Sequence, residues 1–122
     1  MPAQPTASLA VILTHEHTDF DALAAMLAAS KLYAAAVPVL PRQMNRNLEE
    51  FLALYGDALP FVRLDDLPRQ RVERAIVVDT QAVQPVRGMS QATTGLVIDH
   101  HPQMRDLPAG WAFWGEEAGA TT

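Results

Sequence analysis

Short apolar runs alternate with polar and helix-forming stretches along this chain. The runs at Leu9–Leu13, Ala75–Val78 and Leu96–Ile98 are rich in β-formers, and each predicts a strand buried on both faces, as in a parallel sheet. Three weaker runs predict further strands at residues 37–40, 61–64 and 111–114. Because Pro38 cannot donate a ladder hydrogen bond, its strand is predicted to lie at an edge of the sheet.

Two helices are predicted between these strands. Ala, Leu and Met dominate residues 22–33, and Asp19 or Asp21 can cap the first turn of that helix. Residues 47–55 predict the second helix, with Asn47 as its N-cap. The alternation predicts an α/β fold, a three-layer, Rossmann-like, mostly parallel sheet with flanking helices and right-handed crossovers.

Length and composition narrow the class of protein. The 122 residues suit one domain, and the absence of cysteine excludes disulfide scaffolds, thiol nucleophiles and zinc sites built from thiolates. A net charge of −5 argues against a simple nucleic-acid binder. The early apolar run is far shorter than the ~20 residues of a membrane span, and no basic segment precedes it. We therefore expect a cytoplasmic protein without membrane contact, whose residues 1–7 are flexible.

Candidate chemistry gathers where three of the predicted strands end. The first strand leads into His15, Asp19 and Asp21, the second into Asp79, and the third into Asp99, His100 and His101. His17 also lies in the first of these loops, so all four histidines of the chain follow two strands. Since the carboxyl ends of parallel strands share one edge, these side chains are expected to meet in a crevice there.

Carboxylates and imidazoles together suit Mn²⁺, Fe²⁺, Co²⁺ or Zn²⁺, and one carboxylate can bridge two such ions. Cations would also relieve the repulsion among four clustered aspartates. Each residue has a simpler interpretation: Asp19 and Asp21 as helix caps, Asp79 as a turn residue, the histidine pair as structural. These interpretations must all hold independently at three strand ends, which favours the metal site.

In order and spacing, the three motifs resemble those of the DHH phosphoesterase superfamily. They are His15-x-x-x-Asp19-x-Asp21, the strand ending in Asp79, and Asp99-His100-His101-Pro102. Members include RecJ-type exonucleases, oligoribonucleases, cyclic-dinucleotide phosphodiesterases and family II pyrophosphatases. Residues 14–22, 31–33 and 119–122 resemble more closely the N-terminal DHH module of bacterial proteins that also carry CBS domains and a poly(A) polymerase/tRNA nucleotidyltransferase module.

The resemblance implies phosphoester hydrolysis by water that two metal ions activate. It places one Mn²⁺ on His15, Asp19 and Asp79, and a second on Asp21, Asp79 and His100; Mg²⁺, Co²⁺ or Zn²⁺ could replace manganese. Asp99 would orient a histidine, and His101 would donate a hydrogen bond to the phosphoryl group.

The substrate is expected to be a phosphate-containing small molecule or a short oligonucleotide, and the sequence does not choose between short RNA, single-stranded DNA, cyclic dinucleotide and pyrophosphate. His17 stands where the family more often has a small polar residue, so it is an extra metal ligand, a contact to the substrate phosphate or neither, and the last is the stronger expectation. Arg87 is a further candidate for phosphate contact, although a surface role is the stronger expectation for it. Residues 8–122 are expected to be the N-terminal portion of a DHH domain, with a further metal-binding Asp and a substrate domain downstream, through which nucleic acid could bind. Nothing indicates the oligomeric state.

Other classes fit less well. The loop Thr14-His-Glu-His-Thr-Asp19 is similar to that of metallo-β-lactamases, but Phe20 replaces their next histidine. No His-Glu-x-x-His, Gly-x-Gly-x-x-Gly or phosphate-loop lysine is present. A non-catalytic module that binds metal or nucleotide and regulates an attached polymerase remains the alternative function.

Overall fold

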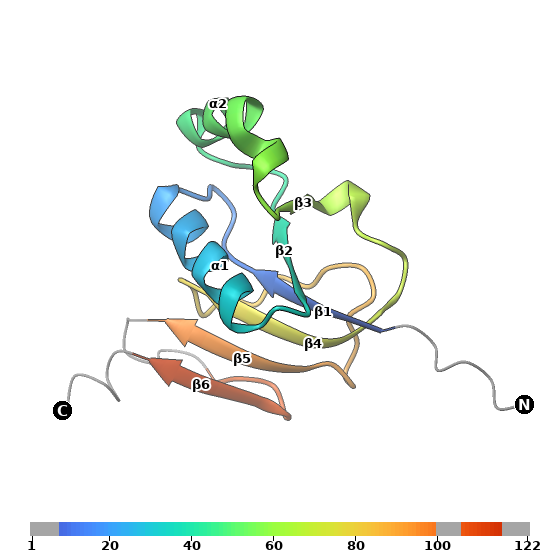
Figure 1. Cartoon of the computed structure of the whole chain (residues 1–122). Coiled ribbons are helices and arrows are strands. Elements are labelled where there is room, and N and C mark those ends of the chain that lie inside the picture. The colour runs from blue at the N-terminus through green and yellow to red at the C-terminus, as the bar shows by residue number, and fades with distance from the viewer. Residues whose placement is uncertain (1–7, 100–105, 116–122) are drawn as a thin grey trace, which may run out of the picture.

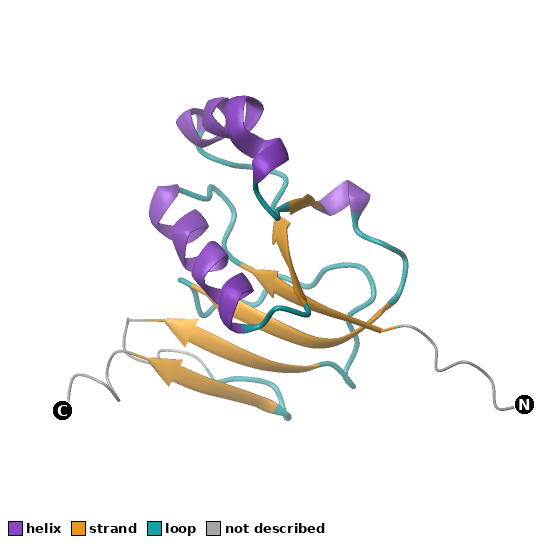
Figure 2. Cartoon of the chain, viewed as in Figure 1, coloured by secondary structure: helices purple, strands orange, loops and turns teal. Residues whose placement is uncertain are grey.

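A computed structural model describes residues 8–99 and 106–115 of the chain. Its centre is a six-stranded parallel sheet in the order β3-β2-β1-β4-β5-β6 (Figure 1). The strands are β1 (Ser8–Leu13), β2 (Ala36–Leu40), β3 (Val62–Arg63), β4 (Arg71–Val78), β5 (Thr94–Asp99) and β6 (Trp111–Gly115). The helices are α1 (Phe20–Leu32), α2 (Arg46–Tyr55) and the short 3-10 turns η1 (Gly56–Ala58) and η2 (Leu64–Asp66) (Figure 2). The flexible stretch predicted at residues 1–7 lies outside the described residues.

The two faces of the sheet are covered differently. On one face, Ile12 and Ile76 pack against Met26 and Ala29 of α1. On the other face, Val11, Val77 and their neighbours are covered by side chains from η2 and from the connections before and after β5; these are Leu64, Leu67, Val83, Val86, Met89 and Leu107. The α/β class and parallel sheet predicted from the sequence are confirmed, while on the second face the described cover consists mainly of irregular segments.

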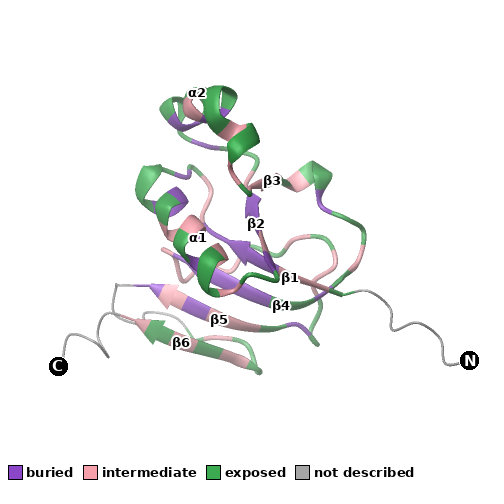
Figure 3. Ribbon diagram, viewed as in Figure 1, coloured by how far each residue is buried: buried purple, intermediate pink, exposed green. Residues whose placement is uncertain are grey.

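Burial is concentrated in the middle of the sheet. Figure 3 shows that the second half of β4 and the end of β1 are buried, whereas β6 alternates between partly buried and exposed residues. The last four residues of β4, Ala75–Val78, are each at most 3% exposed. This burial explains why a continuous apolar run, rather than an alternating one, marks these strands in the sequence.

Two local predictions differ from the structure. Strand β2 is an interior strand, because β3 pairs with it, but only at Val39 and Leu40, so Pro38 lies outside that short ladder. Helix α2 is capped by Asn45 and not by Asn47, since the Asn45 side chain accepts a hydrogen bond from the Asn47 backbone N–H. The first difference depends on how the short strand β3 pairs, and the second on the residue at which α2 begins. A sequence pattern locates the ends of such elements only to within a few residues.

The order of the strands defines where a ligand can bind. From β1 the chain proceeds to β2 and β3 on one side of the sheet, and later from β4 to β5 and β6 on the other. In open α/β sheets, ligands bind beyond the carboxyl ends of the strands at which the order reverses in this way. Here those strands are β1 and β4.

No helix in residues 8–99 and 106–115 is long and apolar enough to span a membrane.

Candidate metal centre

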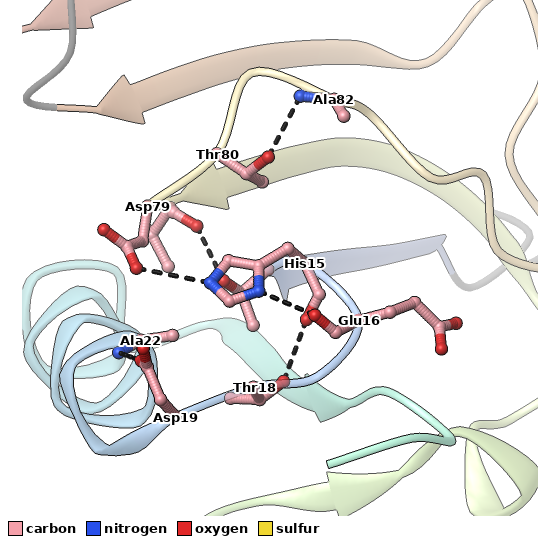
Figure 4. Close-up of polar contacts among 10 residues, drawn as sticks. His15, Glu16, Thr18, Asp19, Ala22, Asp79, Thr80 and Ala82 are labelled. Atoms are coloured by element: carbon pink, nitrogen blue, oxygen red, sulfur yellow. Dashed lines mark hydrogen bonds and ion pairs between the residues drawn. The ribbon is translucent and has the colours of Figure 1, made fainter. Parts of the chain in front are cut away.

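Three side chains converge where β1 and β4 end. His15 follows β1, Asp19 stands at the start of α1, and Asp79 follows β4 directly. One potential ligand atom of each residue lies within 4.8 Å of those of the other two. Figure 4 shows the His15 ring lying toward Asp79, with Asp19 at the first turn of the helix. The structure thus brings together the three residues predicted to bind the first metal ion.

The His15 ring is held in one orientation. Its Nδ1 lies 2.7 Å from the backbone carbonyl oxygen of Glu16, and since a carbonyl can only accept, Nδ1 carries the proton. In the neutral imidazole, Nε2 then offers a lone pair, and it lies 3.4 Å from Oδ2 of Asp79. A cation between these two acceptors would stabilise the arrangement. The hydrogen bond between Nδ1 and the Glu16 carbonyl is of the kind that orients metal-binding histidines, in which one ring nitrogen is held by the protein and the other binds the ion.

Asp19 is the N-cap of α1 and one of the three candidate metal ligands. Its Oδ1 accepts a hydrogen bond of 2.9 Å from the backbone N–H of Ala22, which makes Asp19 the N-cap of α1. The cap fixes the carboxylate at the helix N-terminus, and a carboxylate has further lone pairs available for a ligand. Asp19 itself is exposed, so an ion can reach it from solvent.

Asp79 owes its position to an unusual backbone conformation. Its φ of 61° is in the left-handed region, which Asp tolerates better than most residues. Its backbone N–H donates a hydrogen bond of 3.0 Å to the carbonyl of Ile98 in the neighbouring strand β5. The chain therefore turns sharply after β4, and the carboxylate lies beside His15 instead of continuing along the strand.

Two buried threonines support the β1–α1 loop and were not singled out in the sequence. The Thr14 hydroxyl donates 2.8 Å to the carbonyl of Val78, joining the ends of β1 and β4. The Thr18 hydroxyl donates 2.9 Å to the carbonyl of His15, closing the loop on itself. A hydroxyl directly after a buried apolar strand is a signal that could have identified Thr14.

Asp99 is buried at the end of β5, beside the strand that carries Asp79. Its Oδ2 accepts a hydrogen bond of 2.9 Å from Nε2 of Gln81, a residue that the sequence analysis did not single out. Asp99 is only 4% exposed, as expected of a residue that positions other groups rather than one that faces solvent. His100 and His101, predicted as a metal ligand and as the phosphoryl contact, lie outside the described residues.

Asp21 and His17 do not belong to the group of candidate ligands that converges among the described residues. Asp21 is exposed in the first turn of α1. His17 is exposed, with a φ of 59°, and its backbone N–H is bound to the carbonyl of Gln43.

Arg87 lies far from the three converging residues. It donates to the carbonyl of Leu67, and its neighbour Gly88 accepts from Val72 near the start of β4. At roughly 3.3 Å per residue, Val72 is about 23 Å along the strand from Asp79. The structure therefore does not bring Arg87 to the metal centre.

Two concave regions adjoin the centre. A groove of about 280 Å³ begins at Asp79 and runs between α1 and the outer strands, where Ala28, Leu32, Ile98 and Trp114 line it. A smaller cavity of about 60 Å³ lies beside Thr14 and Glu16. The candidate metal centre is thus bordered by space for a ligand larger than an ion.

The donor set fits a divalent cation. It provides one oriented imidazole nitrogen and two carboxylates, the combination that suits Mn²⁺ and similar ions. Without a cation, two carboxylates this close would repel each other. The motifs that provide these donors also follow β1 and β4, the two strands at which the strand order reverses. Their order along the chain and this common location indicate one shared site.

Comparison with known proteins gives two matches. A family model for the DHH family, N-terminal domain, matches residues 10–122. An A-adding tRNA nucleotidyltransferase of Geobacter sulfurreducens is 38% identical over 98 residues, which is 75% of this chain and 11% of that protein. The chain therefore spans about a ninth of the length of this relative. No solved structure gives a significant match.

Proposed function

The chain belongs to the DHH family, and from that premise we propose that it is a metal-dependent phosphoesterase module. The observation that carries the proposal is the convergence of His15, Asp19 and Asp79, whose ligand atoms lie within 4.8 Å of one another. They converge at the carboxyl ends of β1 and β4, where the strand order reverses and where α/β proteins bind ligands.

In this proposal His15, Asp19 and Asp79 hold one divalent ion, which is Mn²⁺ or, as alternatives, Mg²⁺, Co²⁺ or Zn²⁺. A second ion would use Asp79 again, with Asp21 and His100. When bound, such ions polarise a phosphoryl oxygen and make a coordinated water more acidic.

The chain's own residues prepare this chemistry in three ways. The Glu16 carbonyl fixes the tautomer of His15, so that Nε2 is the nitrogen offered. Helix capping fixes the carboxylate of Asp19. The left-handed conformation of Asp79 keeps its carboxylate at the end of β4. Because these groups are oriented before a ligand arrives, little reorganisation is needed at the moment of reaction.

His101 is proposed to donate a hydrogen bond to the phosphoryl group as negative charge develops on it. Asp99 is proposed to orient a histidine; its burial and its bond with Gln81 support a positioning role. The substrate is proposed to be a phosphate-containing small molecule or a short oligonucleotide.

The relative suggests the setting in which the module acts. Its name states that it adds A to tRNA, and the chain matches only 11% of its length. We infer that this chain serves as a module of a larger RNA-processing or nucleotidyltransferase protein in the cytoplasm, where other domains contact nucleic acid.

The same match supports one alternative. The module could bind metal or nucleotide without hydrolysing a substrate, and so regulate an attached nucleotidyltransferase. Both functions use the same metal centre. They are distinguished by measuring whether the protein hydrolyses a phosphoester substrate.

The test combines Mn²⁺ titration by calorimetry with Mn²⁺-dependent hydrolysis of bis-p-nitrophenyl phosphate. His15→Asn should abolish hydrolysis and lower Mn²⁺ affinity by at least about tenfold, since it removes an oriented first ligand. His17→Asn is the matched control for metal binding: it changes a histidine in the same loop, and Asn tolerates its left-handed backbone.

Equal Mn²⁺ affinity in the His15 variant and the original chain would overturn the metal centre. Retained metal and nucleotide binding without any turnover would favour the regulatory module.

A further inference from the structure

Three aromatic rings contact one another in a row that begins at Phe20, the residue after Asp19. The rings of Phe20 and Phe51 are 5.6 Å apart between centroids and nearly perpendicular, at 78°. The rings of Phe51 and Tyr55 follow at 5.1 Å and 44°. We call Phe20, Phe51 and Tyr55 the aromatic stack. It joins the first residue of α1 to the second half of α2.

The aromatic stack is largely open to solvent. Phe20 is 47% exposed and Tyr55 is 55% exposed, whereas Phe51 between them is half-buried. Packing between the two helices does not depend on the exposed rings, because Leu48 and Leu52 of α2 are buried against Leu23 of α1. Exposed apolar groups that gather beside a binding site mark a contact surface more often than isolated ones do.

The aromatic stack is also fixed in position relative to the metal centre. Phe20 follows Asp19 directly, so their Cα atoms are about 3.8 Å apart. The loop that contains His15 is bound to the loop before α2 by two backbone hydrogen bonds, from His17 to Gln43 and from Asn45 to Thr18. These bonds, together with the T-shaped contact of Phe51, hold Phe20 beside the ligands. Figure 1 shows α2 just beyond the start of α1.

We propose that Phe20, supported by Phe51 and extended by Tyr55, is a stacking platform for a nucleobase of the phosphoester ligand. The inference rests on the proposed function, which places the phosphate at His15, Asp19 and Asp79. An aromatic face accepts any base, because every base has a π-face. A phosphate ester that carries a base therefore gains a contact that a base-free phosphate lacks. The platform selects nucleotides over simple phosphates such as pyrophosphate.

The test compares two probes, AMP and ribose 5-phosphate, which differ only by the base. Both are titrated into the protein by calorimetry in the presence of Mn²⁺. We expect AMP to bind at least about fivefold more tightly than ribose 5-phosphate, as the usual contribution of one stacked base implies. Phe20→Ala should bring the two affinities together by weakening AMP alone, and Phe20→Tyr should keep the difference.

Leu54→Ala is the matched control, because Leu54 is a 77% exposed apolar residue of α2, the helix of Phe51 and Tyr55, and lies outside the aromatic stack. It should leave the ratio of the two affinities unchanged. The Mn²⁺ affinity of each variant shows whether the metal centre is intact, so that a folding defect in Phe20→Ala is recognised. Should that variant fail to fold, Tyr55→Ala takes its place, with a partial loss of the difference expected.

The base could belong to the end of an oligonucleotide or to a free nucleotide. Titration of a trinucleotide of adenosine beside AMP distinguishes these two sources. Tighter binding of the trinucleotide than of AMP assigns the platform to the end of a strand, and equal binding assigns it to a free nucleotide. Either result supports the platform if Phe20→Ala weakens the binding.

Equal affinity for AMP and ribose 5-phosphate in the unaltered chain would refute the platform while leaving the phosphate site intact. An equal loss for both probes in Phe20→Ala would refute it as well. Failure of both probes to bind, by contrast, would be a failure of the proposed function itself.

Discussion

His15 and Asp79 are 64 positions apart in the sequence, yet Nε2 of the histidine lies 3.4 Å from Oδ2 of the aspartate. Both side chains are partly buried, with exposed fractions of 30% and 20%. The contact exists because β1 and β4 are neighbours in the sheet and each supplies one of these residues at its carboxyl end.

Replacing Asp79 by Asn should lower Mn²⁺ affinity by at least about tenfold, as measured by calorimetry. Asn has the same shape and also tolerates the left-handed backbone at this position, so the change removes the charge with little strain. Asp79→Ala should abolish both metal binding and hydrolysis. Asp57→Asn, at an exposed aspartate in η1, is the control and should bind Mn²⁺ normally. Unchanged affinity in the Asp79→Asn variant would show that this carboxylate is not a ligand.

Two substitutions of Asp19 should separate helix capping from metal binding. Asp19→Ala removes the acceptor for the Ala22 N–H and should lower the free energy of unfolding by about 1 kcal/mol, along with Mn²⁺ affinity. Asp19→Ser keeps a capping oxygen, so stability should stay close to the original while Mn²⁺ affinity still falls. Urea denaturation and metal titration measure the two effects. If the serine variant bound Mn²⁺ as tightly as the original, Asp19 would be a helix cap only.

Thr14→Val should lower the free energy of unfolding by about 1–3 kcal/mol, measured by urea denaturation, because the buried carbonyl of Val78 loses its hydroxyl donor. The side chains are similar in size, so the cost reflects the lost hydrogen bond more than a cavity. Thr94→Val is the control: its hydroxyl makes an exposed contact of 3.4 Å to the carbonyl of Glu73, and its loss should cost much less. If both variants lost a similar amount of unfolding free energy, the Thr14 hydrogen bond would contribute no more to stability than the exposed Thr94 contact.

His101→Ala should lower kcat for bis-p-nitrophenyl phosphate while the metal content stays unchanged. The expected reason is that this histidine contacts the phosphoryl group rather than a metal ion. Metal content by mass spectrometry, measured beside the rate, decides the matter. Loss of the metal from this variant would contradict the role assigned to His101.

Local pattern was sufficient for much of the fold. Continuous apolar runs located β1, β4 and β5 because strands buried on both faces cannot alternate with polar residues. The helix-forming run after Asp19 located α1, and its cap was among the two aspartates considered. For α2 the sequence predicts Asn47 as the N-cap, whereas the structure has Asn45. Both residues suit a cap, and only the backbone conformation before the helix decides between them.

The sequence says less about which distant segments of the chain lie together in the fold. Arg87 follows Asp79 by eight positions, which makes it a candidate for phosphate contact, although a surface role is the stronger expectation. The connection after β4 returns toward the start of that strand. The aromatic stack could not be recognised either, because Phe20 and Phe51 come from different helices whose packing the sequence does not reveal.

The sequence by itself determined the elements and the chemical types that follow them: buried strands, and behind them carboxylates and imidazoles. These follow from side-chain polarity and backbone preference, which act over a few residues. The tertiary structure alone decided that β1 lies beside β4, that Asp79 turns back toward His15, and that Phe51 of α2 packs against Phe20 of α1. Those relationships depend on packing between segments far apart in the chain, where many weak contacts act together and no single motif records the outcome.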